Sequence, residues 1–155
     1  MSEHYVTHST FTLEHEYPVS PSRVFSAWAD PAAKVRWFAG PSHDVYELDF
    51  RVGGRELTRG RHADGPVLTF ESRYHDIIVD ERIVFSSTMT AVGQDVTTVS
   101  LTTVELRPQD GGTRLVLTQQ GIYLDGHEDP AWRERGTGAQ LDALGAELGH
   151  TSGDP

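Results

Sequence analysis

The chain has 155 residues, no cysteine and a formal net charge of −10 at pH 7. Its length fits one folded domain with one core, and the lack of cysteine excludes disulfides, thiolate chemistry and cysteine-based zinc sites. Twenty-three acidic residues stand against 13 basic ones. This balance disfavours nucleic acid and anionic membrane surfaces as partners, because both are bound through clustered Lys and Arg.

The chain contains no apolar run long enough to span a membrane, and its N-terminal segment lacks the charged-then-apolar pattern of a secretory signal. We therefore expect a cytoplasmic protein that has no membrane partner. Lys34 is the single lysine among the 13 basic residues. We attribute this excess of arginine to the nucleotide bias of the source genome and assign no function to it.

The N-terminal part of the chain predicts one strand and two short helices. Apolar and polar residues alternate over 9–17, which is typical of a half-buried strand. Ser20 can cap a helix that has Pro21 at its first position, and this helix ends at Asp30-Pro31. A second short helix follows and is expected to end near 37–41.

Six further strands and one long helix are expected in the rest of the chain. The strands are separated by short turn sequences such as Gly53-Gly54. They are predicted at 44–52, 55–62, 67–78, 83–90, 94–107 and 113–122. The helix is predicted at 131–149, so that one domain spans 9–149 and tails lie at 1–8 and 150–155.

This order of elements predicts an α+β fold. Consecutive strands joined by short turns form an antiparallel sheet. One face of such a sheet must be covered, and the C-terminal helix is the only predicted element long enough to cover it. We therefore expect a curved antiparallel β-sheet wrapped around a long C-terminal α-helix, with two short helices between the first two strands.

One face of the C-terminal helix changes character along its length. Its second half carries an apolar stripe of three leucines, Leu141, Leu144 and Leu148. The same spacing, followed toward the N-terminus, passes through Gln140, Thr137 and Arg133. The face that is expected to pack on the sheet is therefore polar at its other end.

Five segments carry a family resemblance. They are V-F-S-A-W-A-D-P-A-A-K-V-R-W-F, L-D-F-R-V-G-G-R-E, Y-H-D-I-I-V-D-E-R-I-V-F-S-S-T-M, G-G-T-R-L-V-L-T-Q-Q-G and G-T-G-A-Q-L-D-A-L-G-A-E-L. In their order and spacing, over 10–148, the chain resembles the SRPBCC superfamily, which has the START-like or helix-grip fold. Within it, the chain looks like the bacterial family named after the activator of the heat-shock-protein ATPase. None of the segments is a catalytic signature, so the resemblance implies a fold more than an activity.

The resemblance implies an apolar cavity between sheet and helix, which superfamily members use for lipids, hormones, polyketides and aromatic substrates. The N-terminal half of the long helix would roof it, so Arg133, Thr137 and Gln140 would face it. Many family members carry Gly-Trp where this chain has Gly136-Thr137, and close relatives tend to have Leu instead of Gln140 and Glu instead of Gln119. These departures imply a roomier, more polar cavity that lacks one carboxylate able to act as an acid or base.

Aromatic side chains are the candidates for the cavity wall. Trp37 and Phe38 follow the second short helix and either gate the cavity mouth or pack in the core, and we favour packing. Phe70, Tyr74 and Met89 lie on central predicted strands and are further candidates. Alternation does not decide which face of the strand that holds Phe70 is inward, because both faces mix polar and apolar residues.

The ionisable residues suggest no catalytic or metal site. Glu71, Arg73, His75 and Asp76 form the densest ionisable run, and we prefer a charge ladder on a solvated face to a general base at His75. Arg133 either binds an anionic ligand group or is a solvated helix residue. The eight histidines show no metal-binding spacing on the predicted helices, and no G-x-S-x-G is present. We expect no catalytic residue, no metal and no cofactor.

Three functions are compatible with the sequence, and we rank first the binding of a small apolar or aromatic molecule in the cavity. The second is a polyketide cyclase-like or hydratase-like enzyme that uses Tyr74, His75 or Asp76 in the same cavity. The third is a chaperone-linked or other protein-interaction module, and homodimerisation through an edge strand is also compatible. For the first function, the expected ligand-binding residues are Trp37, Phe38, Phe70, Tyr74, Met89, Gln119, Trp132, Arg133, Thr137 and Gln140.

Overall fold

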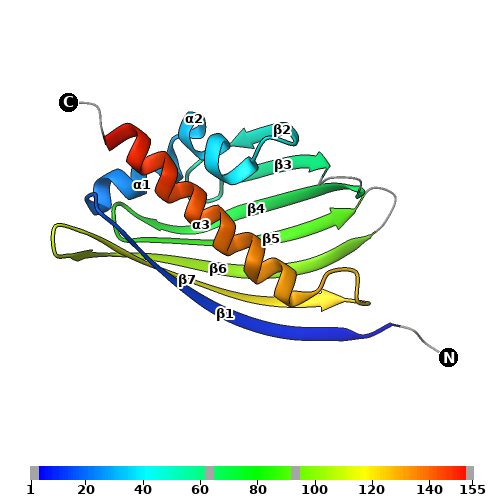
Figure 1. The fold of residues 1–155 in the computed structure, drawn as a ribbon. Helices are drawn as coiled ribbons and strands as arrows, with labels where there is room; N and C mark the ends of the chain where they lie inside the picture. The colour runs from blue at the N-terminus through cyan, green and yellow to red at the C-terminus, as the bar shows by residue number, and fades with distance from the viewer. Residues whose placement is uncertain (1–3, 62–64, 92–94, 153–155) are drawn as a thin grey trace.

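Seven antiparallel strands form one curved sheet in the part of the chain that the computed structural model describes, residues 4–61, 65–91 and 95–152 (Figure 1). The strands lie in the order β1-β7-β6-β5-β4-β3-β2. Their bounds are β1 Val6–Tyr17, β2 His43–Leu48, β3 Arg55–Arg61, β4 Val67–Ile78, β5 Arg82–Ala91, β6 Val96–Gln109 and β7 Gly112–Leu124. Because the long β1 pairs with β7, the N-terminal strand lies beside the last one.

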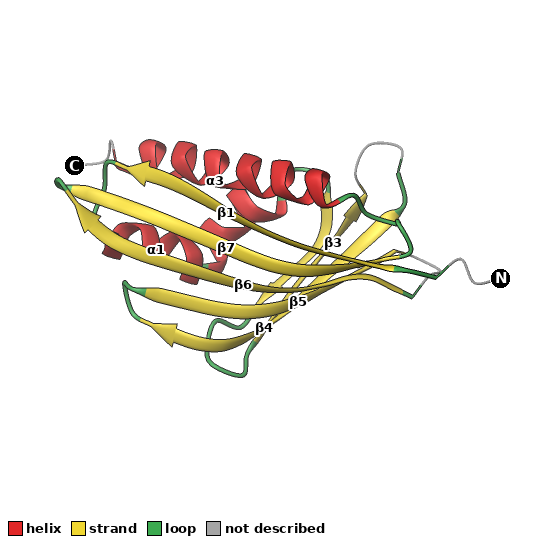
Figure 2. Ribbon diagram, turned by 90° about the horizontal axis from the view of Figure 1, so that it is seen from below, coloured by secondary structure: helices red, strands yellow, loops and turns green. Residues whose placement is uncertain are grey.

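The helices lie on one face of this sheet (Figures 1 and 2). They are α1 Pro21–Ala29, α2 Pro31–Lys34, the π-helical turn η1 Val35–Ala39, and α3 Pro130–Ser152. Ser20 and Asp30 cap α1 and α2, because each side chain accepts a hydrogen bond from a backbone N–H of the first turn. No helix in the described ranges is long and apolar enough to cross a membrane.

The predicted α+β helix-grip fold, with two short helices between the first two strands, is confirmed. The largest differences from the predicted bounds are at three ends: β1 begins at Val6 rather than at residue 9, β2 ends at Leu48 rather than at residue 52, and α3 continues to Ser152 rather than ending at residue 149. The added residues of β1 pair with the end of β7, as Val6 lies opposite Leu124. The rest of the predicted tails, 1–3 and 153–155, the strand end at 62 and the strand start at 94 lie outside the described residues.

The core lies between the sheet and the C-terminal half of α3. Leu141, Leu144 and Leu148 are buried there, as the apolar stripe predicts. The Tyr17 hydroxyl at the end of β1 donates a hydrogen bond of 2.8 Å to the carbonyl of Leu141. This contact and the leucine packing fix the C-terminal half of the helix on the sheet.

A β-bulge in β4 explains why alternation alone does not reveal its inward face. The register with β5 shifts between Tyr74 and Asp76. Before the shift, Ser72 and Tyr74 point inward and are buried. After it, Ile77 packs against the core instead of Asp76. The mixture of residue types on both faces therefore arises from a change of phase within the strand, rather than from a partly polar cavity.

Candidate functional site

A pocket of about 820 Å³ lies between the sheet, the turn η1 and the N-terminal half of α3. The buried part of its wall includes Trp28, Phe85 and Leu117. At the other extreme, Trp132 is 57% exposed and Arg61 is also exposed. Because exposed and buried residues share one wall, the pocket runs from the solvent to the core.

The polar end of the α3 face lies over this pocket. Arg133 and Thr137 line it and are each only 8% exposed, and Gln140 lines it as well. The same helix face therefore packs tightly through its leucines and roofs a hollow through its polar residues. The interpretation of Arg133 as a solvated helix residue is wrong, since its side chain is buried.

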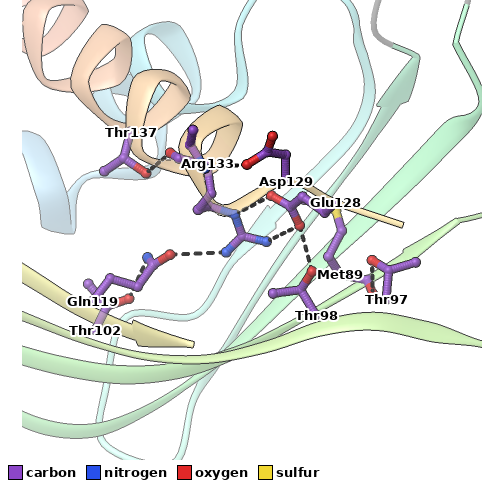
Figure 3. Close-up of polar contacts among 10 residues, drawn as sticks. Met89, Thr97, Thr98, Thr102, Gln119, Glu128, Asp129, Arg133 and Thr137 are labelled. Carbon is purple, nitrogen blue, oxygen red and sulfur yellow. Dashed lines mark hydrogen bonds and ion pairs between the residues drawn. The ribbon is translucent and has the colours of Figure 1, made fainter. Parts of the chain in front are cut away.

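Arg133 forms an ion pair with Glu128, which lies in the loop before α3 (Figure 3). Its Nε and Nη2 donate to the two carboxylate oxygens over 2.7 and 2.9 Å. The Thr98 hydroxyl on β6 donates to the same carboxylate over 2.6 Å. This bidentate pairing fixes the orientation of the guanidinium plane. The sequence analysis missed Glu128, because the loop must fold back before this carboxylate meets Arg133.

Gln119 connects the ion pair to the sheet (Figure 3). Its amide nitrogen donates to the Thr102 hydroxyl over 2.9 Å, and its carbonyl accepts from Arg133 Nη1 over 3.2 Å. Both Gln119 and Thr102 are buried in the pocket wall. The side chains of two strands and one helix therefore form a continuous chain of hydrogen bonds, which fixes each donor and acceptor in one orientation.

Two other polar residues of α3 donate hydrogen bonds to backbone carbonyls. The Gln140 amide donates to the carbonyl of Phe38 over 2.9 Å and so joins α3 to η1. The Thr137 hydroxyl donates to the carbonyl of Arg133 over 2.9 Å. A hydroxyl that donates within its own helix retains acceptor capacity. The Thr137 hydroxyl therefore keeps acceptor capacity but has no free donor.

The aromatic candidates divide between wall and core. Trp37 is 4% exposed and stacks edge-on against Trp28 at 4.8 Å between ring centroids, so it both packs in the core and lines the pocket. Phe38 and Phe70 line the pocket with ring centroids 5.9 Å apart. The Arg133 guanidinium lies 5.6 Å from the Phe70 centroid, within cation–π range.

Nine of the ten expected ligand-binding residues line the pocket; Tyr74 does not. Its ring is buried in the core, and its hydroxyl donates to Glu56 over 3.2 Å. The binding role of the other nine stays a prediction. His75 and Asp76 bond to Ser86 and Arg82 at the surface, so all three acid–base candidates lie away from the pocket wall.

Comparison with known proteins places this architecture in a family. The family model described as Activator of Hsp90 ATPase homolog 1-like protein matches residues 18–149. The chain belongs to this family. A search of curated proteins found no match to the sequence.

Solved structures agree with the Activator of Hsp90 ATPase homolog 1-like assignment. The protein Mll3558 from Rhizobium loti is 46% identical, with 92% of this chain and 99% of that chain covered and a TM-score of 0.86. A protein from Rhizobium leguminosarum is 35% identical, with 95% and 98% covered and a TM-score of 0.90. CV1439 from Chromobacterium violaceum is 27% identical, with 90% and 96% covered and a TM-score of 0.76.

Behind the pocket, this Activator of Hsp90 ATPase homolog 1-like chain buries a second ion pair that the sequence analysis missed. Lys34 and Glu56 are both fully buried, with Nζ 2.9 Å from Oε2. The hydroxyls of Tyr46 and Tyr74 also donate to the Glu56 carboxylate. Lys34 Nζ lies 4.3 Å from the ring centroid of Phe38. The attribution of the single lysine to genome composition therefore overlooks the buried position of Lys34.

Proposed function

We propose that this protein binds a small, mainly apolar or aromatic molecule in the pocket beneath the N-terminal half of α3. One observation carries the proposal: the polar end of the inward α3 face, Arg133 and Thr137, is buried over a hollow of about 820 Å³. Side chains that pack a core would be apolar and would fill this space. The volume falls in the range of small-molecule sites, about 300–1,000 Å³.

The chemistry of the wall supports a ligand that is apolar over most of its surface. Trp28, Phe70 and Phe85 present aromatic rings, while Gln119 and Arg133 present fixed polar groups at one place. Many apolar contacts with a few placed polar groups are the usual composition of a small-molecule site. The rings would supply the affinity and the polar groups the orientation.

A catalytic function receives no comparable support. The cyclase-like or hydratase-like hypothesis relied on Tyr74, His75 or Asp76. The Tyr74 hydroxyl is engaged by Glu56, and the other two bond at the surface. A general acid or base must come within hydrogen-bond reach of the reacting group. These three residues therefore supply no acid or base to the pocket, and we propose binding as the function.

The first test is native mass spectrometry of freshly purified protein, repeated after denaturation. A small molecule that is bound in the first spectrum and released in the second supports the proposal and gives its mass. A thermal-shift screen of lipids and aromatic compounds follows. Ligand at a hundred times its Kd stabilises the folded state by about 2.7 kcal/mol, which is a shift of several degrees for a chain of this size.

A pair of variants shows where the molecule binds. In Thr137→Trp a large ring replaces a buried residue of the pocket roof, whereas in Arg135→Trp the same ring is placed at an exposed position of the same helix, away from the wall. We expect the first variant to lose the ligand-induced shift and the second to keep it. Retention of the full shift in Thr137→Trp would show that the compound binds elsewhere.

A further inference from the structure

The charged groups of the pocket are arranged so that its inner wall is neutral. Among the described residues, the charged and titratable side chains that line the pocket are Arg61, Glu128, Arg133, His43 and His127. The charge of Arg133 is compensated by its bidentate pairing with Glu128. Arg61 is exposed at the rim, where solvent and salt screen its charge. The Arg133–Glu128 pair therefore gives the buried part of the wall polar groups without adding net charge.

The hydrogen-bonding capacity that remains on Arg133 is limited and directional. A guanidinium has five N–H groups. Two of them donate to Glu128 and one to Gln119 (Figure 3). Two N–H groups are therefore left without a partner among the described residues. A ligand carbonyl or hydroxyl oxygen can accept from them while Glu128 stays in place.

A ligand carboxylate at the same guanidinium would be repelled by Glu128. The Glu128 carboxylate accepts from Arg133 through both oxygens and from Thr98 as well. A second anion on the guanidinium would lie beside this carboxylate in a wall that is largely removed from water. Like charges brought together under such conditions repel strongly, because little solvent screens them. Expulsion of Glu128 would break three hydrogen bonds.

We infer that the pocket selects neutral molecules that carry a hydrogen-bond acceptor over their anionic counterparts, and that Glu128 sets this preference. The inference rests on the proposed function and specifies the ligand class of the same site. Ketones, lactones, amides and alcohols attached to an apolar or aromatic body fit it. Free fatty acids and aromatic acids do not. Glu128 acts here through repulsion, as a residue that rejects one class of ligand.

The test compares two probes of nearly identical shape, the methyl ketone acetylnaphthalene and the carboxylate naphthoate, substituted at the same ring position. Their affinities for the wild-type protein are measured by calorimetric titration at neutral pH. We expect the ketone to bind at least about tenfold more tightly, since like-charge contacts in an interface are strongly unfavourable. Equal affinities, or a preference for naphthoate, would overturn the inference and leave the proposed function intact.

Glu128→Gln provides the matched change. Glutamine has the shape of glutamate, and its single carbonyl oxygen can still accept from Arg133 Nη2 and Thr98, but it loses the second acceptor and leaves the guanidinium charge uncompensated. We expect this variant to gain at least about tenfold in naphthoate affinity with little change for the ketone. Asp129→Asn is the control, because Asp129 is the exposed neighbour whose side chain caps Ala131 N–H, and asparagine caps equally well.

The outcomes separate the two claims. Unchanged preference in Asp129→Asn with altered preference in Glu128→Gln supports the inference. An equal gain of naphthoate affinity in both variants would assign the effect to net charge and overturn it. Failure of both probes to bind any of the three proteins would instead count against the proposed function, and the inference would fall with it. If Glu128→Gln does not fold, the wild-type comparison alone decides the inference.

Discussion

Lys34 and Glu56 hold the aromatic wall of the pocket from behind. The Lys34 ammonium lies 4.3 Å from the Phe38 ring centroid and 4.9 Å from that of Trp28. Burial lowers the pKa of this ammonium below its ordinary value, and the Glu56 charge opposes the shift. The ion pair thus fixes the segment that runs from α2 into η1 against strand β3.

Removal of one partner should leave the other charge buried and unpaired. We expect Lys34→Met to lower the free energy of unfolding by about 3–5 kcal/mol, the usual effect of breaking a buried pair. Urea denaturation measures it. The double variant Lys34→Met, Glu56→Gln should lose clearly less than the sum of the two single changes. Strict additivity would mean that the two charges do not interact.

Tyr46 and Tyr74 should make the protein sensitive to alkali. Burial, and then the Glu56 charge, raise the pKa of both hydroxyls well above the ordinary value. Above pH 10 the unfolded chain loses these protons while the folded chain keeps them. The folded state then binds more protons, so stability that is present below pH 10 is lost as pH rises, by about 1.4 kcal/mol per pH unit for each tyrosine.

The alkaline prediction is tested with Tyr46→Phe. Unfolding free energies measured at several values above pH 10 should fall less steeply with pH in this variant than in the wild type, by about one tyrosine's share. The tyrosinate absorbance of Tyr46 and Tyr74 should appear only as the protein unfolds. An identical slope in both proteins would show that Tyr46 ionises as readily in the fold as in water.

At the scale of single residues, the sequence reveals polar positions better than polar partners. Helical spacing alone places Arg133, Thr137 and Gln140 on the inward face of α3, and all three line the pocket. It does not identify Glu128 or Glu56 as partners, because each pair forms only when a loop or a strand returns to a helix. Local pattern determines where a side chain points, whereas tertiary packing determines what it meets.

At the scale of elements, the predicted strands and helices are mostly right where the pattern is local. The predictions fail where a bulge, a turn or a π-helical segment interrupts the regular pattern, because residue composition does not reveal these features. The bulge after Tyr74 reverses the alternation of β4. β2 ends at Leu48, because the residues that follow it enter a turn in which Gly54 N–H donates to the carbonyl of Arg51. The predicted second short helix consists of the α-helical segment α2 followed by the wider π-helical turn η1.

Helix α3 contains glycines that cost it stability. A Cβ built at Gly136 meets no atom within 4 Å, although the residue lies inside the helix. We expect Gly136→Ala to raise the free energy of unfolding by about 0.5–1 kcal/mol, because alanine loses less backbone entropy in a helix. Thermal unfolding should show a rise of a few degrees.

Gly145 is the contrasting position on the same helix. A Cβ there would lie 3.3 Å from Cε1 of Tyr17, so the ring that bonds to Leu141 must shift. Gly145→Ala should therefore gain less than Gly136→Ala, or lose stability. A larger gain at Gly145 would show that helix propensity outweighs this contact.

At the scale of the whole molecule, the protein has a packed end and a hollow end along the same sheet. The inward face of β7 passes from Leu115 to Leu117 and then to Gln119, from the core into the pocket wall. The inward face of α3 makes the same passage from leucines to polar residues. One helix covers both the core and the pocket, because the sheet is curved. The C-terminal half of α3 lies close to the strands, while its N-terminal half spans the pocket.

Substitution of two leucines of β7 should distinguish the packed core from the pocket. Leu115 is fully buried in the core, and Leu117 is 3% exposed but lines the pocket. Leu115→Ala opens a new cavity in packed surroundings and should lower the free energy of unfolding by about 2–5 kcal/mol. Leu117→Ala enlarges a hollow that already reaches solvent, so it loses mainly the transfer free energy and should cost about 1 kcal/mol less. Urea denaturation of both variants gives the comparison. Equal losses would mean that side chains close around position 117 and that the sheet is packed along its whole length.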